Sequence, residues 1–292
     1  LISRSTSLFQ NHEDIATKYK NKYDYILVDE FQDVNNLQVK LIKLLLTDKT
    51  QLFCVGDDWQ SIYGFRGSNV SYIVEFENHF INARTIKLNL NYRSTQNIVG
   101  ASNEVIKNNK FKVDKEVQAS KKSEHKIVVY SGNSEAENIQ FCLHKVKELL
   151  EDGISNDEIL FLYRRSKMYS PYFFKFRNEG ISVQNKTIHS SKGLEAKVVF
   201  IIGLTEGSGG FPDIWLEDRI FQVIKKANHD LLMEEERRLF YVAITRAKDK
   251  LFLITEKGNE SSFLKEIPDV FTVRTSLPIK SVVDKVNTCD SC

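Results

Sequence analysis

Charge of one sign, cysteine and long apolar runs are all scarce in this sequence. Its 41 lysine and arginine residues nearly balance 39 aspartate and glutamate residues, so any surface that binds nucleic acid must be local. Four cysteines are too few for a disulfide scaffold and fit a reducing cytosol, where we expect the protein to work. No apolar run approaches the ~20 residues of a membrane-spanning helix, so we expect no membrane partner. A chain of 292 residues with this composition suits one large or two ordinary globular domains.

Methionine is also scarce, with two residues in all, and the chain does not begin with one. We therefore expect it to be a piece of a longer polypeptide. Near its end, Cys289 and Cys292 form a Cys-x-x-Cys pair. Half of a zinc ribbon would look like this, but two ligands do not make a zinc site. We interpret residues 281–292 as a tail.

The rest of the chain is organised around an apolar run, residues 25–28, and the two acids that follow it. A buried parallel strand that ends in carboxylates delivers them to the edge of its sheet, where α/β folds bind ligands. At that edge Asp29 can hold Mg²⁺ while Glu30 orients or deprotonates a water molecule. For this acid pair alone, a solvated turn after a strand is the simpler interpretation.

A helix and a second strand are predicted next. Residues 36–47 carry leucines at helical spacing, and residues 51–55 are another apolar run that ends in acids. This order indicates a right-handed parallel crossover, which brings both polar ends to the same edge of one sheet. Residues 57–67 then combine three aromatic residues, an amide and an arginine. Bases of single-stranded nucleic acid stack on such rings at roughly 1–3 kcal/mol each, whereas aromatic residues near a strand end also commonly cover a core.

A further series of strands and helices follows. The predicted strands are 85–90, 126–130, 159–163, 198–203 and 251–255, and the predicted helices are 135–150, 170–179 and 234–244. Ser94 is a candidate N-cap for another helix, and the lysine-rich residues 107–126 are predicted to be an exposed connection. Strands that alternate with helices at this spacing indicate two α/β domains, joined near residues 90–93.

Five segments resemble, in order and spacing, the motifs of the UvrD/Rep-like superfamily 1 DNA helicases. They are residues 29–33 (motif II), 56–67 (motif III), 91–94 (motif IV), 187–195 (motif V) and 236–247 (motif VI). Within the family the likeness is closest to helicase IV, through residues 56–60 and 203–208. The resemblance implies two RecA-like P-loop NTPase domains with parallel sheets, the first one incomplete. They would cover residues 1–91 and 92–280, without the large accessory insertion of many relatives.

The resemblance also implies a role for each matching residue. Asp29 would hold Mg²⁺, Glu30 would activate the hydrolytic water, and Gln60 would sense the γ-phosphate of ATP. Arg93 and Arg246 would be arginine fingers that stabilise the charge developing in phosphoryl transfer. The other implied contacts are with ATP for Gln32, Tyr92 and Glu195, and with single-stranded DNA for Tyr63, Phe65, Arg66, Thr187 and His189. ATP would lie between two sheets that supply acids on one side and guanidinium groups on the other.

The chain departs from the family pattern by an absence. The phosphate-binding loop Gly-x-x-x-x-Gly-Lys-Ser/Thr would precede motif II, and the sequence contains no Gly-Lys dipeptide. Without that loop the β- and γ-phosphates lose their principal hold. We therefore expect ATP hydrolysis by the intact protein, and little ATP binding by these residues alone.

Three functions are compatible with these residues. The first is an ATP-dependent helicase or translocase that moves 3′ to 5′ on single-stranded DNA in repair, replication or recombination. The second is the motor subunit of a nuclease or defence complex, whose protein partners the sequence does not identify. The third is a catalytically dead DNA-binding module. The retained acids and arginines argue against the third, because a pure binder has no use for them.

Overall fold

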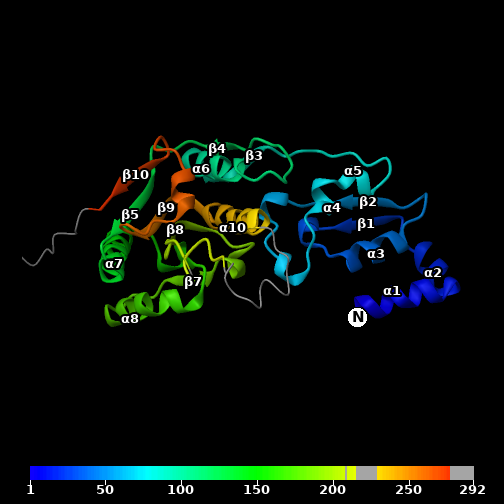
Figure 1. Cartoon of the computed structure of the whole chain (residues 1–292), viewed down its shortest axis with the longest axis horizontal. Helices are drawn as coiled ribbons and strands as arrows, with labels where there is room; N and C mark the ends of the chain where they lie inside the picture. Colours follow the sequence, from blue (N-terminus) through cyan, green and yellow to red (C-terminus); the bar gives the residue numbers. More distant parts are fainter. Residues whose placement is uncertain (208, 215–228, 277–292) are drawn as a thin grey trace, which may run out of the picture. The chain divides into compact units, whose positions relative to one another are not determined.

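The computed structural model describes residues 1–207, 209–214 and 229–276 (Figure 1). They divide into two compact units. The first unit holds residues 1–89, 106–116 and 230–241, and the second unit holds the rest, so residues of helix α10 (His229–Ile244) belong to both. None of the helices in the described part of the chain is long and apolar enough to cross a membrane. The predicted tail and Ser208 lie outside the described residues.

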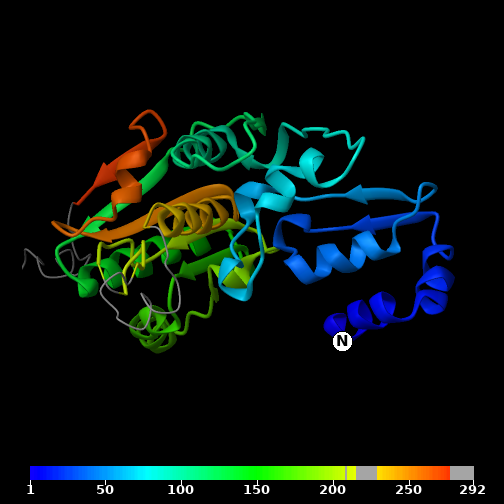
Figure 2. The same ribbon diagram turned by 45° about the vertical axis from the view of Figure 1, so that its right-hand side comes forward.

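The first unit is built around a pair of parallel strands. Strand β1 (Tyr25–Val28) pairs with β2 (Gln51–Cys54), and α3 (Asn36–Leu45) connects them and lies along one side of the pair (Figures 1 and 2). A capping box starts this helix, because the Asn35 side chain accepts from the Gln38 backbone and the Gln38 side chain accepts from the Asn35 backbone. The predicted order of strand, helix and strand is confirmed. The unit also contains α1 (Ile2–Asn11), α2 (Glu13–Lys20), η1 (Phe31–Asp33), η2 (Asp58–Gln60), η3 (Gly64–Arg66), α4 (Ser71–Val74) and α5 (Phe76–His79).

Only one face of this strand pair is covered by the described residues. Phe31 and Phe80 are buried at the centre of a core that α3, α4 and α5 complete. On the opposite face, Tyr25, Leu27 and Phe53 are exposed. The prediction of two buried strands is therefore wrong for this face, since a parallel sheet is buried only where elements pack on both of its sides.

The second unit contains a six-stranded sheet in the order β10-β5-β9-β8-β6-β7, and every pair in it is parallel. This arrangement confirms the predicted fold class of parallel sheets flanked by helices. The strands are β5 (Ile127–Gly132), β6 (Ile159–Tyr163), β7 (Gln184–Thr187), β8 (Ala196–Ile201), β9 (Ala247–Glu256) and β10 (Thr272–Thr275). Between them lie α7 (Glu135–Glu151), α8 (Ser170–Asn178), η4 (Asn156–Glu158), η5 (Ser166–Tyr169), η6 (His189–Ser191) and η7 (Ser262–Glu266). A separate parallel pair joins β3 (Leu90–Thr95) to β4 (Gln118–Lys121), with α6 (Gln96–Lys107) between them.

The core of the second unit centres on a row of three phenylalanine rings. The register places Phe161 of β6 beside Phe200 of β8, and Phe200 beside Phe252 of β9. The ring centroids lie 4.6 and 4.5 Å apart, and the rings are parallel within 2° and 8°. Residues of α7 and α8, including Phe141 and Phe176, pack in the same core cluster. The apolar run of β6 is buried along its whole length, as a strand covered on both faces requires.

Three local predictions are wrong. The strand predicted at 85–90 begins only at Leu90, and residues 83–89 form no regular element. Ile86 and Leu88 alternate with polar residues as in a strand, but both are exposed and no described strand pairs with them. Ser94 lies inside β3 and donates to the Ala247 carbonyl oxygen at 2.6 Å instead of capping a helix. The connection predicted at 107–126 contains β4, and its first residues pack within the first unit.

Candidate functional site

The carboxyl ends of β1 and β2 meet at one edge of the first unit. The strands are parallel and in register, from Tyr25 beside Gln51 to Val28 beside Cys54. Beyond them the Phe31 amide donates to the Val55 carbonyl oxygen at 2.8 Å. The two polar segments that follow the strands are therefore held side by side, as the crossover predicted.

Glu30 has an unusual backbone conformation at this edge. Its φ of 51° and ψ of 41° are left-handed, and Asn82 is the only other non-glycine residue with positive φ in the described ranges. The Glu30 amide donates to Asp29 Oδ1 at 2.8 Å, and both carboxylates are exposed. Left-handed backbone at a bulky residue costs roughly 1–3 kcal/mol, and such strain concentrates at functional sites. The conformation therefore marks Glu30 as a candidate catalytic residue independently of any motif.

The side chain of Gln32 connects the two segments. Its Nε2 donates to Glu30 Oε2 at 2.5 Å, and its Oε1 accepts from the Asp57 amide at 2.9 Å. Gly56 leaves room for this contact, because a Cβ there would lie 2.5 Å from Gln32 Oε1. Gln32 is completely buried. The structure thus shows it as a bridge between motifs II and III, and its contact with a nucleotide stays a prediction.

Gln60 continues this network. Its Nε2 donates to Asp57 Oδ2 at 2.7 Å. Glu30, Gln32, Asp57 and Gln60 therefore form one hydrogen-bonded series across the ends of both strands. The sequence predicted three of these residues as site residues and did not single out Asp57, although its place in motif III was visible.

The aromatic loop divides between core and surface. Trp59 is buried and meets Tyr241 edge-on, with ring centroids 5.5 Å apart. Phe65 is exposed, and the Arg66 guanidinium lies over two rings, 5.0 Å from the centroid of Tyr63 and 5.3 Å from that of Phe65. Trp59 thus covers a core, as one interpretation predicted, and stacking of bases on Tyr63 and Phe65 stays a prediction. The exposed part keeps the predicted grouping of rings with a cation.

A charged cluster in the second unit joins motifs IV and V. Arg93 Nε donates to Glu195 Oε2 at 2.6 Å, and Lys248 Nζ lies 2.6 Å from Glu195 Oε1. The hydrogen bond from Lys248, followed by Arg93, lowers the pKa of Glu195. Lys248 carried no signal in the sequence, because a lysine at a strand start is ordinary. The structure therefore brings Arg93 and Glu195 together and adds a second cation.

Arg246 is 1% exposed, which is unusual for an arginine. Its Nε donates to the Val242 carbonyl oxygen at 3.0 Å, and its Nη1 donates to the Leu194 carbonyl oxygen at 3.1 Å. These bonds tie the end of α10 to the residue before Glu195. The role of Arg246 as an arginine finger stays a prediction.

Three other predicted residues, Tyr92, Thr187 and His189, belong to the second unit. Tyr92 is exposed. Thr187 ends β7, and its hydroxyl lies 2.8 Å from the Ser190 hydroxyl. His189 begins η6 and is half-buried. Their contacts with nucleotide or DNA stay predictions.

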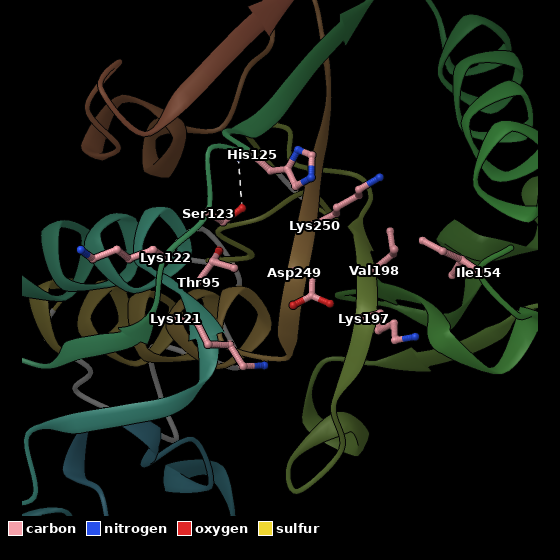
Figure 3. Close-up of a pocket in the computed structure, with 10 residues that line it drawn as sticks. All are labelled: Thr95, Lys121, Lys122, Ser123, His125, Ile154, Lys197, Val198, Asp249 and Lys250. Atoms are coloured by element: carbon pink, nitrogen blue, oxygen red, sulfur yellow. Dashed lines mark hydrogen bonds between the residues drawn. The ribbon is translucent and has the colours of Figure 1, made fainter. Parts of the chain in front are cut away.

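A pocket of about 430 Å³ lies beside the start of β8 and β9 in the second unit (Figure 3). Four lysines and one carboxylate, that of Asp249, are among its lining residues, and Figure 3 shows Lys122 turned away from Asp249. Lys197 at its rim is paired with Glu158 at 2.5 Å. No predicted site residue lines this pocket.

Comparison with known proteins gives matches over most of the chain. Residues 1–81 match the UvrD/REP helicase N-terminal domain, and residues 86–184 and 175–258 match the UvrD-like helicase C-terminal domain. A Mycoplasma pneumoniae protein named "Probable DNA helicase" is 34% identical over 87% of this chain and 48% of its own length. A Mycoplasma capricolum protein named "Probable DNA helicase II homolog" is 40% identical over 66% of this chain and 26% of its own length. The ATP-dependent DNA helicase PcrA of Staphylococcus aureus is 36% identical over 60% of this chain and 24% of its own length.

The chain therefore spans about half or less of these relatives. The two family matches follow the same order as the motifs, with the acids and the aromatic loop in the first match and the arginines in the second. The chain belongs to the UvrD-like helicase family.

Proposed function

We propose that this chain supplies the acidic half of an ATP-hydrolysing site and a DNA-contacting loop to a helicase that moves 3′ to 5′ on single-stranded DNA. We further propose that it works in the cytoplasm, in repair, replication or recombination. The observation that carries the proposal is the hydrogen-bonded series Glu30–Gln32–Asp57–Gln60, with Glu30 held in a left-handed conformation. The names of its relatives support it.

In this proposal the residues of the series divide the work. Glu30 accepts the proton of the attacking water, and the Gln32 amide fixes the direction of that carboxylate. Gln60, held by Asp57, donates toward the γ-phosphate as charge develops on it. Because Gln32 orients Glu30, the Asp57 amide holds Gln32 and the Asp57 carboxylate holds Gln60, little reorganisation is needed during the reaction.

The residues present fit Mg²⁺. Asp29 is an exposed oxygen donor at a strand end, and the described residues contain no group of three or more metal-ligating side chains. This matches Mg²⁺, which binds through one or two carboxylates together with substrate phosphates and keeps several waters. When bound, Mg²⁺ would neutralise charge on the phosphates.

The phosphate-binding loop must come from outside these residues in this proposal, because no Gly-Lys dipeptide is present. Isothermal titration of the 292-residue chain with a non-hydrolysable ATP analogue is expected to give a dissociation constant weaker than about 1 mM. The sequence lacks the loop motif whose backbone amides would hold the β- and γ-phosphates. Micromolar affinity would contradict this expectation and show that the acids and arginines hold ATP by themselves.

The aromatic loop is expected to bind single-stranded DNA through the exposed ring of Phe65. Phe65→Ala should weaken the affinity of the chain for a labelled oligothymidine by about 5- to 150-fold, because one stacked base contributes roughly 1–3 kcal/mol. Fluorescence anisotropy measures this affinity. Phe174→Ala is the matched control, since Phe174 is 61% exposed and Phe65 is 56% exposed. Equal effects of Phe65→Ala and Phe174→Ala on the affinity would show that the loop is not part of the DNA interface.

A further inference from the structure

Lys115 is a half-buried lysine that holds two carboxylates of motif III. Its side chain is 13% exposed, and its Nζ lies 2.6 Å from Asp57 Oδ1 and 2.8 Å from Asp58 Oδ1. The same ammonium lies 4.6 Å from the centre of the Trp59 ring. Three consecutive residues of motif III therefore meet one lysine that lies more than fifty residues further along the chain.

The backbone around Lys115 is fixed to the same motif. The Val113 amide donates to Asp58 Oδ2 at 2.7 Å, and the Val113 carbonyl oxygen accepts from Trp59 Nε1 at 3.2 Å. Residues 106–116 belong to the same compact unit as motif III. Lys115 is thus held in place by contacts other than its own charge, so it can act as a fixed point for Asp57.

Asp57 links Lys115 to Gln60 through its carboxylate. Asp57 Oδ1 accepts from Lys115 Nζ and from the Trp59 amide, and Asp57 Oδ2 accepts from Gln60 Nε2. Both carboxylate oxygens are therefore occupied by donors, which fixes the rotation of the carboxylate. Substituting Lys115 removes the stronger of the two hydrogen bonds to Oδ1. A charged donor makes shorter and stronger hydrogen bonds than a neutral amide does.

The two neighbouring carboxylates favour the ammonium form of Lys115. Burial alone would lower the pKa of Lys115, but the attraction of Asp57 and Asp58 and their hydrogen bonds outweigh it and raise the pKa. The simpler role for such a group is stability alone, since a buried carboxylate left without its partner is costly. A test must therefore separate stability from the placement of Gln60.

We propose that Lys115 is a positioning residue for ATP hydrolysis, which acts through Asp57 to hold the Gln60 side-chain amide in its working direction. The proposal rests on the function proposed above, in which Gln60 contacts the γ-phosphate. It extends that function to a residue outside the five family motifs.

The first measurement uses the chain itself and needs no ATP. Lys115→Met keeps the length of the side chain and removes its charge, and it is expected to shift the NMR resonances of the Gln60 side-chain amide, assigned by their loss in Gln60→Leu. Lys112→Met is the matched control, because Lys112 is 14% exposed, lies in the same segment and donates to the Asn109 carbonyl oxygen at 2.8 Å. Should Lys115→Met fail to fold, the double variant with Asp58→Asn removes one of the two unpaired carboxylates and is measured in its place.

The second measurement follows ATP turnover in the full-length protein. Lys115→Met is expected to lower kcat by up to about 10²-fold, the cost of a misplaced catalytic group, with little change in KM. In a Gln60→Ala background it should cause no further loss, since both changes remove the same interaction. Unmoved Gln60 amide resonances, or a full additional loss in that background, would overturn the proposal. Absence of turnover in the unmodified protein, with the amide shift present, would overturn the proposed function instead.

Discussion

Replacing Glu30 with glutamine is expected to lower the ATP turnover of the full-length protein by about 10²–10⁴-fold, the usual contribution of a general base. Glutamine has the shape of glutamate but cannot accept the proton of the attacking water. The side chain at position 30 is exposed at the end of β1, so the substitution leaves no buried charge unpaired and should not unfold the protein. Steady-state hydrolysis in the presence of single-stranded DNA measures the loss.

The DNA affinity of the same variant should stay close to that of the unmodified protein. Glu30 belongs to the series that ends at Gln60, whereas the rings proposed to contact DNA are those of the half-buried Tyr63 and the exposed Phe65. Glu124→Gln serves as the control, since Glu124 is an exposed carboxylate in the connection after β4. Unchanged turnover in Glu30→Gln would show that Glu30 is not the general base. Catalysis would then not explain its left-handed backbone conformation.

The elements that the sequence predicted correctly carry their signal locally. Residues 135–150 have a long helical period and a serine cap, and α7 runs Glu135–Glu151 with Ser134 accepting from the Glu137 amide. The run 159–163 is five consecutive apolar residues and is a strand of the same bounds. Where local propensity, period and capping agree, the tertiary structure has nothing to override.

The elements that the sequence missed depend on partners far along the chain. The alternation at residues 85–90 is typical of a strand, yet a strand exists only through bonds to a neighbour, and β3 finds β4 only from Leu90 onward. Residues 107–116 belong to the lysine-rich stretch 107–126 that predicts an exposed connection. Their contacts are made with Asp58, Trp59 and α10, none of which a local pattern contains.

The site shows the same division. Asp29 and Glu30 were predictable because an acid pair at a strand end is a compact signal. The bridging position of Gln32 and the cation supplied by Lys248 were not, since both result from distances between segments that are adjacent only in the folded unit. The motifs therefore indicate the residue types of the candidate site, whereas the hydrogen bonds that join these residues depend on the fold.

Phe200→Ala is expected to have the largest effect on stability, lowering the free energy of unfolding of the second unit by about 3–5 kcal/mol. Phe200 is fully buried, and its ring stacks against two others in the row that crosses β6, β8 and β9. Alanine would leave a cavity between Phe161 and Phe252 and break both ring contacts, each of which contributes about 0.5–1.5 kcal/mol beyond burial. Denaturant unfolding combined with hydrogen exchange of the amides of the central strands measures the loss.

The matched comparison is Phe174→Ala, which removes an exposed ring of the same size from α8 in the same unit. Its effect should stay within about 0.5 kcal/mol, because surface substitutions away from caps and ion pairs change stability little. The contrast isolates the position of the ring from its chemistry. If Phe200→Ala destabilised the protein no more than Phe174→Ala, the row of rings would not be the centre of the core, and the packing of α7 and α8 on the sheet would have to be explained by other contacts.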